Sequence, residues 1–321
     1  MKSGSQASEA VILKMLERRA GKGIMLLAGV IALLLGWHFF SGSSSADQWT
    51  VSDDGVLDYA VSPSQYNLSP PEDDGNSTLS TVSFQSRGAN IAALLRIPWS
   101  GSTGDEVNGS IPGVVLLPGA TVSKEREQIL ARHLADLGYA SITLDQRNLG
   151  GIDPKGDLQM FLKDEEPTEH KMVYDALAAG QILRSRPEID PARIIYAGES
   201  NGGRFAIIAC ALDSSARGVL AISTCGYGTD AAVSSAGGLD KNLVRFYRSI
   251  DPETYLSKIA PRPLVMIHSR NDTIIDYQLA ERTFALAVEP KRFHTVDCRV
   301  HGYCSQMDEA IEEELKSMAA K

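Results

Sequence analysis

One serine lies in a sequence context that limits how the chain around it can fold. Residues 193–197 form a short β-branched and aromatic run that predicts a strand, and residues 203–212 form an apolar run that predicts a helix. Between them stands Gly198-Glu199-Ser200-Asn201-Gly202. Small residues at the two glycine positions let the strand and the helix approach closely, and the serine then takes a strained backbone conformation that projects its hydroxyl outward. The pattern predicts a nucleophilic serine at this turn.

A serine hydroxyl is a weak nucleophile near neutral pH and needs an imidazole base, which in turn needs an acid to fix its tautomer. His301 follows the predicted last strand, residues 292–297, and precedes a glycine, which suits a loop at the edge of a sheet. Asp272 follows the predicted strand that ends at His268. We therefore expect Ser200, Asp272 and His301 to act as nucleophile, acid and base.

The remaining histidines and two further carboxylates fit these roles less well, because they lie in the apolar N-terminal segment, in predicted helices or in predicted strands (His38, His133, His170, His268, His294, Asp276 and Asp297). Each expected triad member has an alternative interpretation: Ser200 as a helix cap, Asp272 as a turn residue and His301 as a surface loop residue. The chain has no His-Glu-x-x-His and no Cys-x-x-Cys pattern, so we expect no metal and no cofactor.

The chain order nucleophile, acid, histidine resembles that of the α/β-hydrolase superfamily, and the resemblance covers roughly Ser80 to Lys321. It implies that the loop after the predicted strand 114–117 supplies one oxyanion-hole amide, from Ala120 or Thr121. The second would be the amide of Asn201. Many members of the superfamily have histidine before the glycine of that loop, where this chain has proline.

A second motif supports the resemblance. Asp145-Gln146-Arg147-Asn148-Leu149-Gly150-Gly151 is similar to the Asp-x-Arg-Gly-x-Gly turn of the superfamily. Asn148 stands where the turn has a glycine, and asparagine is the residue best able to take the left-handed conformation of a glycine. Among subgroups, the chain is most similar to dienelactone-hydrolase-like and prolyl-oligopeptidase-like catalytic domains.

Strands alternate with helices along the rest of the chain, which predicts a mostly parallel sheet with helices on both faces. The expected strands are residues 81–86 and 91–97, paired as a hairpin, then 114–117, 140–144, 194–197, 219–223, 264–268 and 292–297. The expected helices are residues 124–137, 168–186, 203–212, 278–288 and 305–320. Residues 226–258 have no strand to join, so we expect them to form a small lid over Ser200.

The N-terminus carries a different signal. Residues 24–40 form a 17-residue run without a formal charge, which is the lower limit for a helix that spans a bilayer. Residues 1–23 contain five basic and two acidic residues, whereas residues 41–86 contain acidic residues and no lysine or arginine. The positive-inside rule then predicts a cytoplasmic segment 1–23, a transmembrane signal anchor 24–40 and a catalytic domain 80–321 outside the cytoplasm. Residues 41–79 are expected to be a linker with little structure.

Two alternatives to the anchor remain. The small residues Ser44-Ser45-Ala46 could be a cleavage site, in which case the protein would be secreted after removal of a signal peptide. The apolar run could also be a buried core helix. The net charge of −9 argues against nucleic-acid binding.

The chain has four cysteines. Cys298 and Cys304 bracket His301, and in an oxidising compartment a disulfide there would hold the histidine loop; two free thiols are the alternative. Cys210 and Cys225 are expected to be buried small apolar residues.

These expectations combine into a membrane-anchored serine hydrolase that acts outside the cytoplasm. The resemblance implies hydrolysis of a small-molecule ester through an acyl-enzyme, with a peptidase acting on short peptides as the second possibility. A third is a non-catalytic exported binding protein on a hydrolase scaffold, since a fold does not fix a function.

Overall fold

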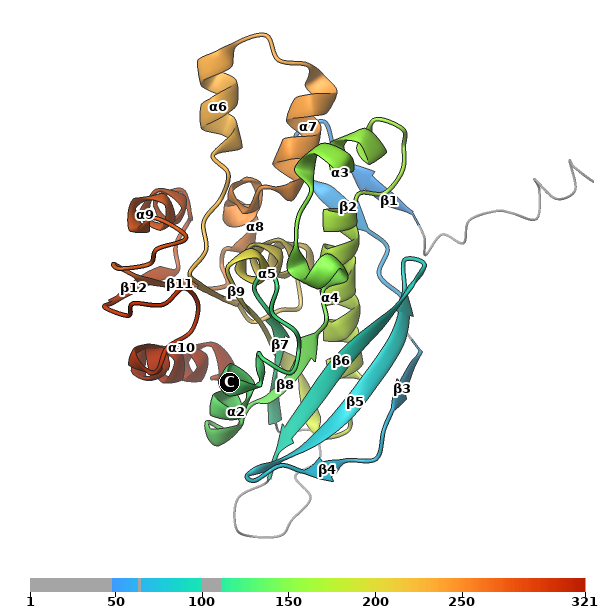
Figure 1. Ribbon diagram of the computed structural model, residues 1–321, viewed down its shortest axis with the longest axis vertical. Coiled ribbons are helices and arrows are strands. Elements are labelled where there is room, and N and C mark those ends of the chain that lie inside the picture. Colours follow the sequence, from blue (N-terminus) through green and yellow to red (C-terminus); the bar gives the residue numbers. More distant parts are fainter. Residues whose placement is uncertain (1–47, 63–64, 100–110, 321) are drawn as a thin grey trace, which may run out of the picture. The chain divides into compact units, whose positions relative to one another are not determined.

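A sheet of ten strands forms the centre of the part of the chain that the structure describes, which is residues 48–62, 65–99 and 111–320 of a computed structural model (Figure 1). The chain divides into two units, Met1–Gln48 and Trp49–Lys321, and apart from Gln48 every described residue belongs to the second. The sheet strands are β3 (Tyr66–Leu68), β4 (Glu72–Asp73), β5 (Ser77–Ser86), β6 (Ala89–Pro98), β7 (Ile111–Leu117), β8 (Ala140–Leu144), β9 (Ile189–Glu199), β10 (Val219–Ile222), β11 (Leu264–Ser269) and β12 (Lys291–Val296).

The strand order is β12-β11-β10-β9-β7-β8-β6-β5-β3, with β4 paired to β5. The strands from β7 to β12 are parallel to their neighbours, and β3 to β6 add antiparallel pairs at one edge. This is the mostly parallel sheet expected from the sequence. β9 lies in the middle, so its carboxyl end, where Ser200 follows, is flanked by the ends of β7 and β10.

Helices cover both faces of the sheet, as expected (Figure 1). The helices are α2 (Gln128–Asp136), α3 (Pro154–Phe161), α4 (Thr168–Arg184), α5 (Asn201–Leu212), α6 (Thr229–Ala236), α7 (Lys241–Ile250), α8 (Leu256–Ile259), α9 (Tyr277–Ala285) and α10 (Asp308–Ala319), with 3-10 turns η2 (Arg147–Gly150), η3 (Pro252–Tyr255) and η4 (Ser305–Met307). Side chains alternate along β7: Val115 and Leu117 pack in a core with residues of α4 and α5, whereas Val114 and Leu116 pack on the other face with residues of α2 and α10.

The linker prediction for residues 41–79 is wrong over its second part. Residues from Trp49 onward form β1 (Trp49–Val51) and β2 (Leu57–Tyr59), an antiparallel pair, before β3 and β4 join the sheet. Leu57 is fully buried, and its N–H donates to the hydroxyl of Tyr255 at 3.0 Å. These strands are only two or three residues long, and the polar composition around them concealed their packing.

One further difference concerns the start of a helix. The helix expected at residues 124–137 begins only at Gln128, because Lys124 donates its N–H to the carboxylate of Asp145 at 2.9 Å and the next residues form turns.

The expected lid, residues 226–258, consists of α6, α7, η3 and α8. In Figure 1, α6 and α7 stand at the top of the molecule, beyond the end of the sheet. The expected membrane segment lies outside the described residues, and within those residues no helix is long and apolar enough to cross a bilayer.

If β2 is part of the fold, its buried side chain contributes to stability. We expect Leu57→Ala to lower the free energy of unfolding by about 2–5 kcal/mol, because the change leaves a cavity in the core. Asp58→Ala, at an exposed position of the same strand, should change it by less than about 0.5 kcal/mol. Urea unfolding of both variants measures the difference, and equal midpoints would contradict the packing of β2.

Candidate active site

The turn at Ser200 has the strained geometry that the sequence predicts. Ser200 has φ 52° and ψ −119°, directly between β9 and α5, and its N–H donates to the carbonyl of Ile222 at 2.9 Å. A side chain at Gly202 would collide with the carbonyl oxygens of Leu117 and Pro118. The close approach of α5 to the end of β7 therefore requires this glycine and forces the serine into its positive φ.

Asp272 and His301 are brought together at the ends of neighbouring strands. Nδ1 of His301 lies 2.8 Å from Oδ2 and 3.0 Å from Oδ1 of Asp272. The Asp272 side chain is fully buried, whereas that of His301 is 21% exposed. Because an ionised carboxylate only accepts hydrogen bonds, Nδ1 is the protonated nitrogen, which leaves Nε2 as an acceptor. Nε2 has no hydrogen-bond partner among the described side chains.

The surroundings of Asp272 keep it ionised. Burial raises the pKa of this carboxyl, but hydrogen bonds from the backbone N–H groups of Ile275 and Ile274 and from His301 outweigh that effect and leave the pKa below its ordinary value. The two backbone bonds measure 3.0 and 2.9 Å. A permanently charged acceptor beside Nδ1 fixes the imidazole tautomer and stabilises its protonated form.

The loop after β7 lies against the nucleophile turn. A Cβ placed on Gly119 would lie 3.4 Å from the Cβ of Ser200. Of the two amides considered for the oxyanion hole, that of Thr121 is already engaged, since it donates to the carbonyl of Leu149 at 2.6 Å. This excludes Thr121 in the described conformation and leaves Ala120. The amide of Asn201 opens α5, where helical N–H groups have no partner within the helix.

The turn at residues 145–151 supports this loop. Asn148 has φ 51°, the left-handed conformation predicted for it, and Leu149 follows with φ 49°. The side chain of Asn201 donates to the carbonyl of Gly150 at 3.0 Å, and Gln146 donates to that of Pro118. The turn thus connects the residue after the serine to the candidate oxyanion loop.

Sequence reasoning gave no role to His268, but the structure places it against the acid. Its Nε2 lies 3.0 Å from the carbonyl of Ile275 and 3.7 Å from Oδ2 of Asp272, and its side chain is fully buried. Burial lowers the pKa of this histidine, so it is neutral and donates from Nε2. The sequence signal that could have predicted this contact is the spacing of four residues between His268 and Asp272 across the end of the strand.

The other described histidines serve elsewhere. His170 is fully buried in α4 with Nε2 2.7 Å from the hydroxyl of Ser249, and burial lowers its pKa to about 3. His294 is a side chain of β12, as predicted, with Nε2 2.6 Å from the carboxylate of Glu314. Asp276 caps α9. Within the described residues, no cluster of three or more His, Cys, Asp or Glu side chains could hold a metal ion.

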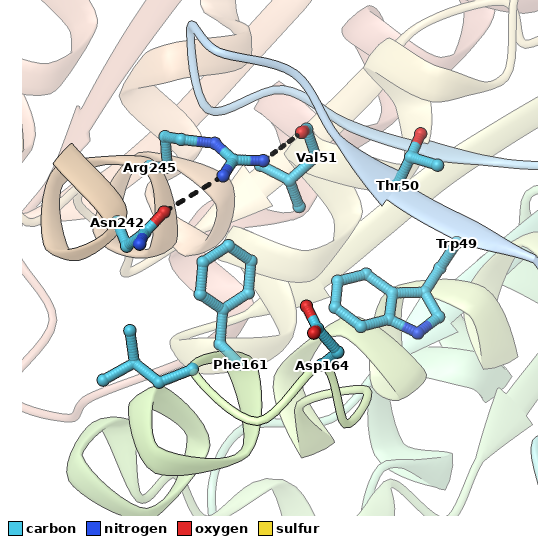
Figure 2. Close-up of a pocket in the computed structure, with 8 residues that line it drawn as sticks. Trp49, Thr50, Val51, Phe161, Asp164, Asn242 and Arg245 are labelled. Carbon is cyan, nitrogen blue, oxygen red and sulfur yellow. Dashed lines mark hydrogen bonds between the residues drawn. The ribbon is translucent and has the colours of Figure 1, made fainter.

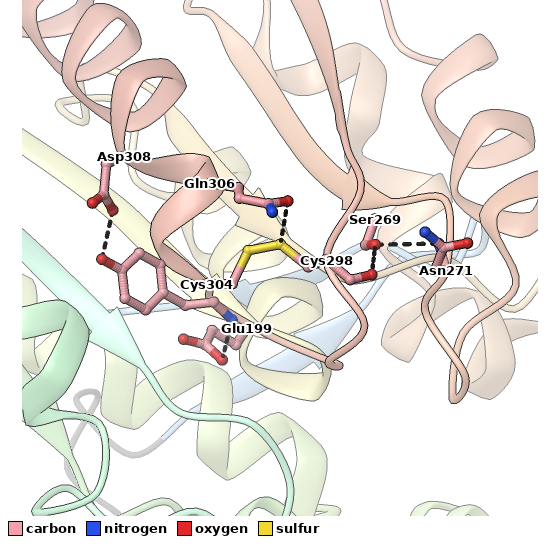
Figure 3. The surroundings of a disulfide bond; sticks show 8 residues. Glu199, Ser269, Asn271, Cys298, Cys304, Gln306 and Asp308 are labelled. Carbon is pink, nitrogen blue, oxygen red and sulfur yellow. Dashed lines mark hydrogen bonds between the residues drawn. A yellow bond between two sulfur atoms is a disulfide. The ribbon is translucent and has the colours of Figure 1, made fainter.

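A disulfide joins Cys298 to Cys304 and closes the loop that carries His301 (Figure 3). The hydroxyl of Ser269, at the end of β11, donates to the carbonyl of Cys298 at 2.5 Å and holds the first end of the loop. Cys210 is buried, as expected, whereas Cys225 is only partly buried because it lies in the loop that leaves β10 for α6.

The described residues also form pockets away from Ser200, Asp272 and His301. One of 580 Å³ is lined by residues of β1, the end of α3 and α7, with Trp49, Phe161 and Arg245 facing it (Figure 2). Another, of 320 Å³, is an apolar groove between α6 and α7 that begins at Tyr227. The Tyr227 ring lies 4.2 Å from the guanidinium carbon of Arg204, which donates to the side chain of Asn201 at 2.9 Å. Arg204 therefore links the start of the segment 226–258 to Asn201, the residue after Ser200.

Comparison with known proteins agrees with this arrangement. The model of the acetyl xylan esterase family matches residues 85–271, a stretch that includes Ser200. The uncharacterized protein YfhR of Escherichia coli O157:H7 is 31% identical over 132 residues, which are 39% of this chain and 44% of that protein. An uncharacterized protein of Mycobacterium tuberculosis is 30% identical over 191 residues, which are 59% of this chain and 62% of that protein. The chain thus spans about half the length of these curated relatives.

Solved structures show the same architecture. The acetyl xylan esterase from Paenibacillus sp. R4 superposes with a TM-score of 0.63 at 18% identity, over 79% of this chain and 88% of that one. The glucuronoyl esterase from Solibacter usitatus superposes with a TM-score of 0.61 at 15% identity, over 86% of this chain and 90% of that one. Together with the strand order, these likenesses establish the α/β-hydrolase fold.

Proposed function

Because the chain belongs to the acetyl xylan esterase family, we propose that it is a serine hydrolase that cleaves carboxylic esters. The observation that carries the proposal is the pairing of Asp272 with Nδ1 of His301, at 2.8 Å, at the same end of the sheet as the strained Ser200 turn. A buried carboxylate behind an imidazole whose other nitrogen is unpartnered is the arrangement that a nucleophilic serine needs.

In the proposed reaction, Ser200 attacks the ester carbonyl while Nε2 of His301 removes the hydroxyl proton. Asp272 stabilises the imidazolium, which then gives its proton to the departing alcohol. The amides of Ala120 and Asn201 would hold the oxyanion of the tetrahedral intermediate. Water enters, His301 deprotonates it, and hydrolysis of the acyl-enzyme returns the serine. In the described conformation Nε2 has no partner, so the bond between His301 and Ser200 would form with substrate in place.

The family and the similar structures favour an ester of a carbohydrate as the substrate class, since those structures include an acetyl xylan esterase and a glucuronoyl esterase. A panel of p-nitrophenyl esters with aminoacyl anilides, on the fragment from residue 47, tests the choice of an ester over an amide. Faster cleavage of the anilides than of the esters would favour a peptidase over an esterase. No turnover of either class of compound would favour a binding protein.

Ser200→Ala should abolish ester hydrolysis and labelling by a fluorophosphonate probe, because the hydroxyl is the proposed nucleophile. The loss should be about 10³-fold or more. Circular dichroism should show an unchanged fold. Activity retained by a folded, contaminant-free variant would exclude Ser200 as the nucleophile.

The two histidines near the last strand provide a matched pair. His301→Ala should lose activity to the same extent as Ser200→Ala, since base and nucleophile act as a unit. His294→Ala should keep most activity but lose about 1–3 kcal/mol of stability, because it leaves the fully buried Glu314 without this partner. Rates and urea midpoints of both variants separate the roles, and the reverse pattern would overturn them.

We also propose that residues 24–40 anchor the protein and that the catalytic domain lies outside the cytoplasm, on the charge asymmetry of the sequence. Cysteine-accessibility mapping of full-length protein in intact cells should label positions in the domain and not positions in residues 1–23. The mass of the mature N-terminus distinguishes an anchor from a cleaved signal peptide. Labelling of positions in residues 1–23 and not in the domain would contradict the proposed orientation and place the domain in the cytoplasm.

A further inference from the structure

Glu199, the residue before the serine, reaches across to the loop of the histidine. Its Oε2 accepts the backbone N–H of Tyr303 at 3.1 Å (Figure 3). Gly302, with φ 91°, lies so close that any side chain there would collide with the same oxygen. Tyr303 and Gly302 follow His301 directly. One carboxylate thus joins the nucleophile turn to the backbone beside the base.

A second carboxyl lies behind the first. Glu127, at the N-cap position of α2, is only 4% exposed, and its carboxyl interacts electrostatically with that of Glu199. Two carboxyls can share a hydrogen bond only if one of them is protonated. Burial, and then the charge of Glu199, raises the pKa of Glu127 well above its ordinary value. Burial also raises the pKa of Glu199, against the opposing effects of the Tyr303 N–H, Glu127 and His301.

Other anchors hold the loop but do not bind it to the serine turn. The disulfide between Cys298 and Cys304 closes the loop on itself, and Ser269 holds its first end to β11. Beyond Glu199, the Tyr303 hydroxyl donates to Asp308 at 2.6 Å, and its ring stacks with His133, at a centroid distance of 6.0 Å. These last contacts hold Tyr303 to α2 and α10. Among the described hydrogen bonds, that of Glu199 connects the loop to the residue next to Ser200.

We infer that Glu199 and Glu127 form a hydrogen-bonded positioning pair that sets the distance between His301 and Ser200. The pair holds one proton between two carboxyls, and Glu199 presents its other oxygen to Tyr303. Loss of that proton would leave two adjacent buried negative charges, which repel each other and push Glu199 from its place. The inference rests on the proposed esterase function for its kinetic test, and on geometry alone for its structural test.

The sign of the pH effect follows from the raised pKa values. Groups that bind a proton more tightly in the folded protein stabilise it at low pH, and this contribution is lost as the pH rises through the folded-state pKa. The described titratable groups that face the pair are His301, Asp308 and His133, the last two through Tyr303. The positioning pair should therefore weaken on the alkaline side, where a simple triad keeps its deprotonated histidine and stays active.

The kinetic test uses four variants and a p-nitrophenyl acetate assay from pH 5 to 10. Glu199→Ala should lower kcat by about 10–100-fold with little change in KM, because a small misplacement of the base slows the chemical step. Glu199→Gln, which keeps an oxygen for Tyr303 and an N–H for Glu127, should restore most of that loss. Glu127→Gln carries a permanent N–H donor and should retain activity to a higher pH than the wild type. Glu125→Gln, whose side chain is 60% exposed, is the control and should leave kcat and its pH profile unchanged.

Hydrogen exchange provides a readout that does not depend on activity. The backbone amides of the peptide that contains residues 299–303 should exchange faster in Glu199→Ala than in the wild type and in Glu125→Gln. In the wild type, the same peptide should exchange faster above the pKa of the pair than below it, after correction for the intrinsic exchange rates. Unchanged kcat, pH profile and exchange in folded Glu199→Ala would overturn the positioning role. If the wild type lacks esterase activity, the proposed function fails, and the exchange comparison alone then decides the positioning role.

Discussion

The contact between the start of α5 and the end of β7 is the constraint on which the site depends. Gly202 lies so close to the carbonyls of Leu117 and Pro118 that no side chain fits there. This close approach forces Ser200 into a positive φ, and the Ser200 N–H donates a hydrogen bond to the carbonyl of Ile222. It also holds the Gly119 loop against the turn at Ser200. Because β9 is in the middle of the parallel strands, loops from both neighbours can converge on the one residue that the turn exposes. Asp272 and His301, the proposed acid and base, follow β11 and β12, farther along the same edge.

Sequence alone predicted the parts whose signal is local. The strand that leads to Asp272 is buried throughout, and the one that leads to Ser200 is buried from Ile194 to Gly198, because strands covered on both faces bury every side chain. The turn at Ser200 and the left-handed Asn148 also follow from residues within a few positions of each other. His301 could be preferred to His294 because the last strand ends at Val296, and β12 keeps His294 as an ordinary strand residue.

The features that sequence missed depend on distant partners. β1 and β2 are only three residues long and lie among polar residues, and Leu57 is held by Tyr255, almost two hundred residues later. The sequence allows Thr121 as an oxyanion donor, but in the structure its amide donates a hydrogen bond to the carbonyl of Leu149 in a different turn. Glu199 was only the variable position of a motif, since neither Tyr303 nor Glu127 is near it in the chain. Such pairings arise from tertiary packing, which local propensity does not encode.

The disulfide around His301 has a consequence for the redox behaviour of the molecule. It closes a loop of only a few residues, so in the chain-entropy description it stabilises the fold as a whole by about 2 kcal/mol. Its main effect is local, since it restrains the segment that carries His301, whereas the turn at Ser200 is built on a separate part of the sheet. A thiol reductant would therefore loosen the loop of the proposed base and leave the turn of the proposed nucleophile in place. The compartment's redox potential would act on turnover more than on folding.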